Sequence, residues 1–194
     1  MSTNPGGRSP IELYVNAMER TKRYVAGVRP DQWTGPTPCT EWNVRQLVNH
    51  IVSENLWSAE LLKEKAIAEV GNRLDGDLLG SNPQAAYDNS VQVAKGAVEA
   101  PGAMEVVCHV SYGDISGADY AGDLFTDLLI HGWDIAKATG QDTSLDPDLA
   151  AACYARVEPV KDELRASGVF GSDVPVAPDA DLQTKLLALL GRQA

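Results

Sequence analysis

Long apolar runs and paired cysteines are missing from this sequence of 194 residues. No uninterrupted apolar stretch approaches the roughly 20 residues that a membrane-spanning helix needs, and the first eight residues lack the apolar core of a signal peptide. The three cysteines are Cys39, Cys108 and Cys153. An odd number at such wide spacing favours neither a disulfide framework nor a C-x-x-C metal site. We therefore expect a reduced, cytoplasmic protein.

Basic residues are also scarce. The chain has 16 Lys and Arg against 27 Asp and Glu, a formal net charge of -11. Proteins that follow nucleic-acid phosphates need a basic surface, so the charge disfavours nucleic acid as a partner. It disfavours an anionic membrane surface for the same reason. Because no Walker A, G-x-G-x-x-G or G-x-S-x-G motif is present, the P-loop, Rossmann and α/β-hydrolase classes lack support.

Amphipathic segments with helix-capping signals make up most of the chain. Ser9 and Pro10 begin the first predicted helix, which continues to about residue 27. The other three long helices are expected over residues 40–70 with Thr40 as N-cap, over 85–100, and over 117–139 with Gly140 at the C-terminal end. Four such helices around one core favour an all-α fold, a four-helix bundle.

Shorter elements complete the prediction. Residues 104–110 are rich in β-branched side chains and form either a short hairpin or an extended crossover between the third and fourth helices. Pro147 begins a further helix to about residue 167. Residues 168–180 are expected to be a loop, and residues 181–190 a last short helix.

The candidate chemistry rests on few residues, because the chain has only three histidines, His50, His109 and His131. His50 and His131 lie beside apolar positions in predicted helices. Each has a carboxylate four residues away on the same helix face, Glu54 after His50 and Asp127 before His131. Within an apolar stripe, an acid and an imidazole are unfavourable to bury unless they are paired or bound to a metal.

Two interpretations of these pairs remain open at this point. Each pair is a local hydrogen bond at the edge of the core, or the two helices face each other and His50, Asp127 and His131 bind one divalent metal. Two imidazoles and a carboxylate suit zinc, with a fourth position open for water or substrate. Iron(II) and nickel accept the same ligands.

Several other reactive or aromatic residues are expected to have no chemical role. His109 lies in a β-rich segment and is expected to have no chemical role. Cys108 beside it is expected to be a small buried hydrophobe, because neither a base placed to lower its pKa nor a helix N-terminus is evident. The four tryptophans are expected to anchor the core rather than to stack on a ligand; they are Trp33, Trp42, Trp57 and Trp133.

Three segments together resemble a known family. They are WTGPTPCTEWNVRQLVNH at residues 33–50, DLLIHGWD at residues 127–134 and LLALLGR at residues 186–192. The combination resembles the metal-binding proteins of the DinB/YfiT-like superfamily, in the branch of the mycothiol-dependent maleylpyruvate isomerase N-terminal domain. The similarity extends from about residue 9 to residue 192.

The resemblance implies an up-down-down-up four-helix bundle with a long crossover. It also implies a metal held by a histidine on the second helix and by an acid and a histidine, four residues apart, on the fourth. Those roles match His50, Asp127 and His131, although the isomerase has a glutamate at the position of Asp127. We predict a disordered tail over residues 1–8, a metal-binding bundle over 9–144, and a C-terminal helical extension over 145–194 packed on the bundle.

The resemblance further implies chemistry with mycothiol or another low-molecular-weight thiol. The expected function is a metal- and thiol-dependent isomerase or transferase for a small electrophile, with zinc, nickel or iron as the metal. Glu54 is a candidate for orienting His50 or moving a proton, and a surface carboxylate is the other interpretation of it. The alternative function is a non-catalytic metal-binding or stress-response module. The expected partners are the small substrate and the thiol, and a homodimer is compatible with the sequence.

Overall fold

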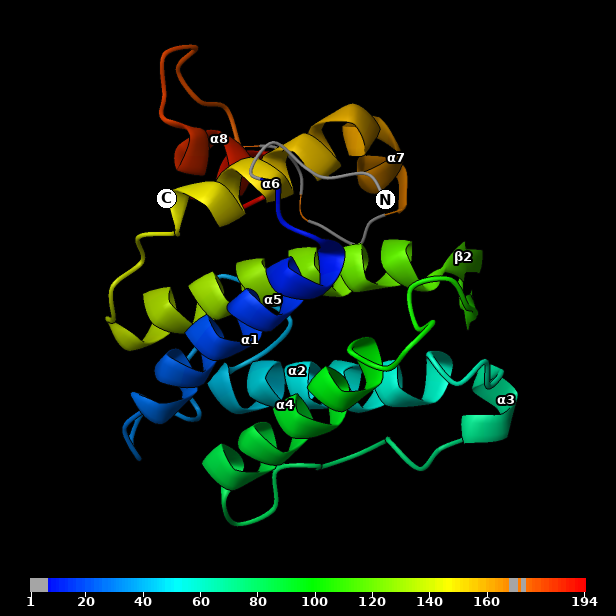
Figure 1. Ribbon diagram of the computed structural model, residues 1–194. Coiled ribbons are helices and arrows are strands. Elements are labelled where there is room, and N and C mark those ends of the chain that lie inside the picture. Colours follow the sequence, from blue (N-terminus) through cyan, green and yellow to red (C-terminus); the bar gives the residue numbers. More distant parts are fainter. Residues whose placement is uncertain (1–6, 168–170, 172–173) are drawn as a thin grey trace. The chain divides into compact units, whose positions relative to one another are not determined.

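The computed structural model describes residues 7–167, 171 and 174–194. Most of this part of the chain is helical, and it includes one small two-stranded sheet (Figure 1). The chain divides into two compact units. One is Pro10–Thr143, and the other combines residues 7–9 with the described part of Ser144–Ala194. Among the described residues, no helix combines the length and the apolar character that a membrane crossing requires.

Four long helices build the first unit: α1 (Pro10–Ala26), α2 (Val44–Leu61), α4 (Pro83–Val98) and α5 (Gly117–Thr139). Helix α1 packs mainly against α5, and α2 mainly against α4; smaller contacts join α1 to α4 and α2 to α5. Each helix therefore buries its apolar stripe against two others, and the hydrophobic effect stabilises the shared core. The largest fully buried side chains there are Tyr14, Met18, Leu47, Ile51, Tyr87, Phe125, Ile130, Trp133 and Ile135.

The predicted helix over residues 40–70 is wrong at both ends. The N-cap of α2 is Asn43, not Thr40. The Asn43 side chain accepts a hydrogen bond from the Gln46 backbone, and the Gln46 side chain accepts one from the Asn43 backbone. This reciprocal pair satisfies two backbone donors at the start of the helix. At the other end, the backbone of Glu64 is left-handed with a φ of 59°, so a separate short helix, α3 (Ile67–Val70), follows.

Helix α5, which supplies most of the candidate site, has the predicted bounds. Its N-cap, Ser116, accepts a hydrogen bond from the backbone N–H of Asp119. Its C-terminal end is Gly140 in the left-handed conformation, with a φ of 71°. Just before α5, strands β1 (Val107–Val110) and β2 (Gly113–Ser116) form an antiparallel hairpin. The structure thus selects the hairpin from the two predicted alternatives.

The helix predicted from Pro147 to residue 167 is interrupted. Helix α6 (Pro147–Val157) leads into a 3-10 turn, η1 (Glu158–Val160), and then into α7 (Lys161–Ser167). Pro159 lies in this turn and has no N–H to continue the α-helical hydrogen bonds. Helix α8 (Leu182–Leu189) packs against α6. The predicted tail and the predicted loop at 168–180 fall partly outside the described residues.

Helices α1 and α5 approach each other closely at Gly132. A Cβ atom at this position would lie 2.4 Å from Oγ1 of Thr21 on α1. Alanine favours helix by about 1 kcal/mol over glycine, but the branched threonine side chain is stiff and overpacking costs about 1–3 kcal/mol. We therefore expect Gly132→Ala to lower the free energy of unfolding, as measured by urea denaturation.

Gly96, in α4, is the matched control because nothing lies within 4 Å of a Cβ built there. The same change at Gly96 should leave stability unchanged or raise it by up to about 1 kcal/mol. Adding Thr21→Ala to Gly132→Ala should restore part of the loss, since the clashing oxygen is removed. If Gly132→Ala is as stable as Gly96→Ala, the close approach of α1 and α5 is wrong.

Candidate metal centre

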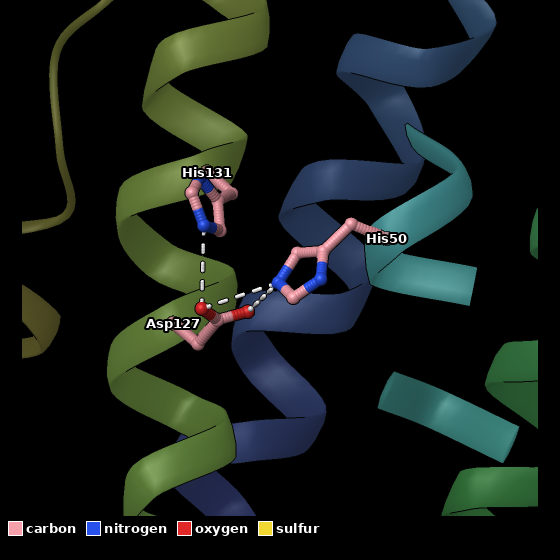
Figure 2. A group of neighbouring side chains, drawn as sticks. All are labelled: His50, Asp127 and His131. Carbon is pink, nitrogen blue, oxygen red and sulfur yellow. Dashed lines mark hydrogen bonds and ion pairs between the residues drawn. The ribbon is translucent and has the colours of Figure 1, made fainter. Parts of the chain in front are cut away.

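Helices α2 and α5 bring together the three residues that the sequence singled out. His50 lies on α2, and Asp127 and His131 lie on α5 (Figure 2). The Nε2 atom of His50 is 3.3 Å from Oδ2 of Asp127, and Nε2 of His131 is 3.3 Å from Oδ1 of the same carboxylate. The two imidazole centroids are 5.2 Å apart. One ligand atom from each of the three residues lies within 4.8 Å of the others.

Helical spacing explains this arrangement. Asp127 and His131 are four residues apart, so they lie on one face of α5, one turn from each other. On α2, His50 lies beside the buried stripe that includes Leu47 and Ile51. The site therefore forms at the edge of the core. The side chains of His50 and Asp127 keep 22% and 27% of their exposure, while His131 keeps 7%.

The charges of the three groups are strongly coupled. Burial alone would raise the pKa of Asp127, but the imidazoles of His131 and His50 hold that pKa well below its ordinary value. Burial alone would lower the pKa of His131, but the carboxylate of Asp127, helped by Asp134, raises it to about 9. Without a metal, Asp127 is therefore ionised and His131 carries a proton at neutral pH.

Asp134 is a site residue that the sequence analysis did not assign. Its side chain is fully buried, and its Oδ2 is 3.0 Å from Nδ1 of His131. The two residues are three positions apart on α5, a spacing that places side chains on one helix face. The sequence shows this spacing. It does not show which of the acids near His131 is buried against the imidazole.

Trp42 is the second unpredicted neighbour of the site, and its assignment to the core is wrong. Its ring is half-buried and stacks on His50, with centroids 4.4 Å apart and planes at 26°. It is also 5.7 Å from the ring of His131. Of the four tryptophans, only Trp133 is fully buried as predicted, whereas Trp33 and Trp57 are half-buried.

The loop before α2 holds Trp42 in place. The hydroxyl of the buried Thr37 lies 2.9 Å from the carbonyl oxygen of Cys39 and 2.8 Å from that of Trp42. The backbone N–H of Trp42 donates to the carbonyl of Cys39, and that of Val44 donates to Gly35. These hydrogen bonds fix the backbone on both sides of the tryptophan, so its ring is directed at the site by local structure.

Glu54 lies one turn after His50 on α2 and is half-buried. Burial, followed by the charge of Asp127, raises its pKa to about 7, although His50 and His131 oppose this rise. It is not among the three residues whose ligand atoms cluster. Its carboxyl group is thus close enough to the site to sense its charges and has a pKa suited to proton exchange near neutrality.

The residues of the hairpin lie outside this cluster. His109 is exposed on β1, with Nδ1 2.7 Å from Oδ1 of Asp114 on β2. Cys108 is fully buried, as predicted, and burial raises the pKa of its thiol to about 11. A raised pKa keeps a cysteine protonated, so Cys108 has little nucleophilic character.

The donor set of His50, Asp127 and His131 fits a divalent metal. Nε2 of each histidine lies 3.3 Å from the carboxylate of Asp127, and one ligand atom of each residue lies within 4.8 Å of the others. Imidazole nitrogen and carboxylate oxygen are both common zinc ligands. The contact between Nδ1 of His131 and Asp134 resembles the carboxylate–histidine pairs that accompany metal-binding histidines. Iron(II) and nickel accept the same donors, so the residues do not select one metal.

The family model of the mycothiol maleylpyruvate isomerase N-terminal domain matches residues 14–136 of the chain. The chain belongs to this family. The domain is part of the DinB/YfiT-like superfamily. As a member of the mycothiol maleylpyruvate isomerase N-terminal domain family, the chain carries all three clustered residues, His50, Asp127 and His131, within the matched range.

Two relatives of this family member are found in Mycobacterium tuberculosis, and both are described as uncharacterized. Protein MT0763 of strain CDC 1551 / Oshkosh and protein Rv0738 of strain ATCC 25618 / H37Rv are each 34% identical to the chain over 192 residues. The similarity covers 94% of this chain and 97% of each relative. It therefore extends beyond the range of the family model. No solved structure matches the chain.

The shifted pKa values predict how the stability of the metal-free protein depends on pH. Glu54 and His131 bind a proton more tightly when the chain is folded than when it is unfolded. The free energy of unfolding must then fall as the pH rises from the ordinary pKa of each group to its pKa in the folded chain. This range runs from 4.5 to about 7 for Glu54 and from 6.5 to about 9 for His131. Urea denaturation in the presence of a chelator should show the midpoint decreasing over these ranges.

One variant isolates the contribution of Glu54 from that of His131, and a second variant is the control. Glu54→Gln should flatten the dependence below neutral pH, because the substituted amide does not titrate. The exposed His109, changed to Gln, should leave the whole profile unchanged. A midpoint that is constant or rises between pH 6.5 and about 9 would contradict the tight proton binding by His131.

Proposed function

We propose that this chain is a metal-dependent enzyme that uses a low-molecular-weight thiol, with mycothiol as the first candidate, on a small electrophile. The observation that carries the proposal is the cluster of His50, Asp127 and His131, whose ligand atoms lie within 4.8 Å of one another. The chain belongs to a family whose description names mycothiol and maleylpyruvate isomerase, and this supports the choice of thiol and of reaction class. We also propose that the four long helices form the up-down-down-up bundle of that superfamily.

His50, Asp127 and His131 would hold the metal, with zinc as our first choice. A bound divalent metal lowers the pKa of a thiol that it coordinates, and so favours the nucleophilic thiolate at neutral pH. The carboxylate of Asp127 offsets part of the positive charge of such an ion. The residual exposure of His50 and Asp127 leaves the cluster open to small molecules, whereas Trp42 covers a face of the His50 ring.

Two reactions suit a thiolate at this position. In an isomerisation, the thiolate would add to an activated cis carbon–carbon double bond to give an enolate-like anion, and rotation about the resulting single bond would follow. The C–S bond would then break, so that the trans double bond re-forms and the thiolate leaves. In a transfer, the adduct takes up a proton and is released. We propose that Glu54 accepts the thiol proton and returns it. Its position one turn after His50 and its pKa of about 7, which lets it exist in both forms near neutral pH, support this role.

The metal ligands can be tested without a substrate. Asp127→Asn keeps the size of the side chain but removes its charge, and His131→Ala removes a donor. Loss of even an outer-shell partner costs about 10–100-fold in metal affinity. We expect zinc affinity, measured by competition with a chromogenic chelator, to fall at least that far for Asp127→Asn and further for His131→Ala.

His109→Ala is the matched control, since it removes an exposed histidine that also contacts an aspartate. It should bind zinc as the unmodified chain does. Equal zinc affinity in Asp127→Asn and His109→Ala would show that the carboxylate is not a ligand. The absence of zinc, nickel and iron(II) binding in the unmodified chain would overturn the proposal as a whole.

Catalysis is tested separately with Glu54→Gln. Adduct formation between a small thiol and a panel of electrophiles should slow by about 10²–10⁴-fold, the usual contribution of a general acid–base group, while the metal content stays unchanged. Glu60→Gln is the control on the same helix, because Glu60 pairs with Lys65 and Arg73 instead. If the metal-loaded chain shows no thiol-dependent turnover, it is a non-catalytic metal-binding module.

A further inference from the structure

The imidazole of His131 lies between two carboxylates of its own helix. Asp127 precedes it by four residues, and Asp134 follows it by three. Nε2 of His131 is 3.3 Å from Oδ1 of Asp127, and Nδ1 is 3.0 Å from Oδ2 of Asp134. Each ring nitrogen of this histidine therefore has its own acidic partner, one helical turn away on either side.

The two carboxylates have different surroundings. The side chain of Asp127 keeps 27% of its exposure, whereas that of Asp134 keeps none. The positions around Asp134 on α5 are buried and mostly apolar; they include Leu128, Leu129, Ile130, Trp133, Ile135 and Ala136. A buried carboxylate is strongly unfavourable unless it is paired or hydrogen-bonded. Packing alone would favour an apolar residue at this position, and the contact with His131 is one reason for an aspartate there.

The contact with Asp134 decides which nitrogen of His131 is available to the site. A carboxylate only accepts hydrogen bonds, so Nδ1 must carry the proton that it donates to Asp134. The ring is then held with Nε2 toward Asp127, which also contacts His50, as Figure 2 shows. Without this contact, Nδ1 loses its carboxylate partner, and only the contact between Nε2 and Asp127 restrains the ring.

We propose that Asp134 is a positioning residue that holds His131 with Nδ1–H bound and Nε2 directed at the metal. Its negative charge also makes the imidazole a stronger ligand. The metal-binding part of this inference rests on the proposed function. The orientation of the ring is a property of the metal-free chain and can be measured without any metal.

Zinc binding by the purified full-length chain tests the first part. Asp134→Ala removes the hydrogen-bond acceptor, and we expect zinc affinity to fall about 10–100-fold. Asp134→Asn keeps an acceptor oxygen of the same size and loses only the charge, so its affinity should lie between those of Asp134→Ala and the unmodified chain. Asp114→Ala is the control, because it removes the same kind of contact from the exposed His109.

Nuclear magnetic resonance of the metal-free chain tests the second part. The Nδ1–H proton of His131 should give a downfield resonance that exchanges slowly, because it is buried and bound to a carboxylate. In Asp134→Ala the resonance should lose its downfield shift and exchange faster, because the hydrogen bond to the carboxylate is gone, whereas in Asp134→Asn the hydrogen bond should remain. A merely structural role for Asp134 would lower the unfolding temperature without changing zinc affinity in the folded chain.

The outcomes separate the two proposals. Wild-type zinc affinity in both folded Asp134 variants, or an Nδ1–H resonance in Asp134→Ala with unchanged shift and exchange rate, would overturn the positioning role. If Asp134→Ala does not fold, unchanged zinc affinity in Asp134→Asn is the contradicting result. If the unmodified chain binds no metal, the proposed function and the metal-binding part of this inference fall together. The Nδ1–H resonance then still decides whether Asp134 orients the ring.

Discussion

One carboxylate, that of Asp127, joins two imidazoles from helices that are far apart in the sequence, and the candidate site depends on it. Its oxygens are 3.3 Å from Nε2 of both His50 and His131. In the metal-free chain, a proton on His131 balances this charge, as the raised pKa of about 9 indicates. A metal ion and that proton use the same nitrogen. Metal affinity should therefore be linked to pH, because a ligand must lose its proton before it binds.

Much of the fold follows from local signals in the sequence. The bounds of α5 were predictable because Gly140 supplies the left-handed C-terminal residue, and the start of α1 because Pro10 suits a first helical position. The start of α2 was not predictable in this way, since Thr40 and Asn43 are both good N-cap residues. Only the reciprocal bond with Gln46 favours the second. Pro159 is visible in the sequence, but the prediction of one continuous helix from Pro147 to about residue 167 did not take its missing N–H into account.

The candidate site was predictable where its residues share a helix and less so where they do not. The spacing of Asp127 and His131 places them on one face, whereas their meeting with His50 depends on the contact between α2 and α5. It was the family resemblance that favoured this meeting over two separate local pairs. The position of Trp42 could not be predicted, because it depends on the loop conformation that the Thr37 hydroxyl fixes by donating hydrogen bonds to the carbonyl oxygens of Cys39 and Trp42.

The central claim is that His50, Asp127 and His131 hold one metal ion, and anomalous X-ray diffraction tests it most directly. Crystals of the full-length chain grown with zinc should show one anomalous peak at the zinc absorption edge among the three side chains. The peak should lie about 2.0–2.2 Å from Nε2 of each histidine and from an oxygen of Asp127. No peak at this position, with the carboxylate still hydrogen-bonded to both imidazoles, would contradict the account.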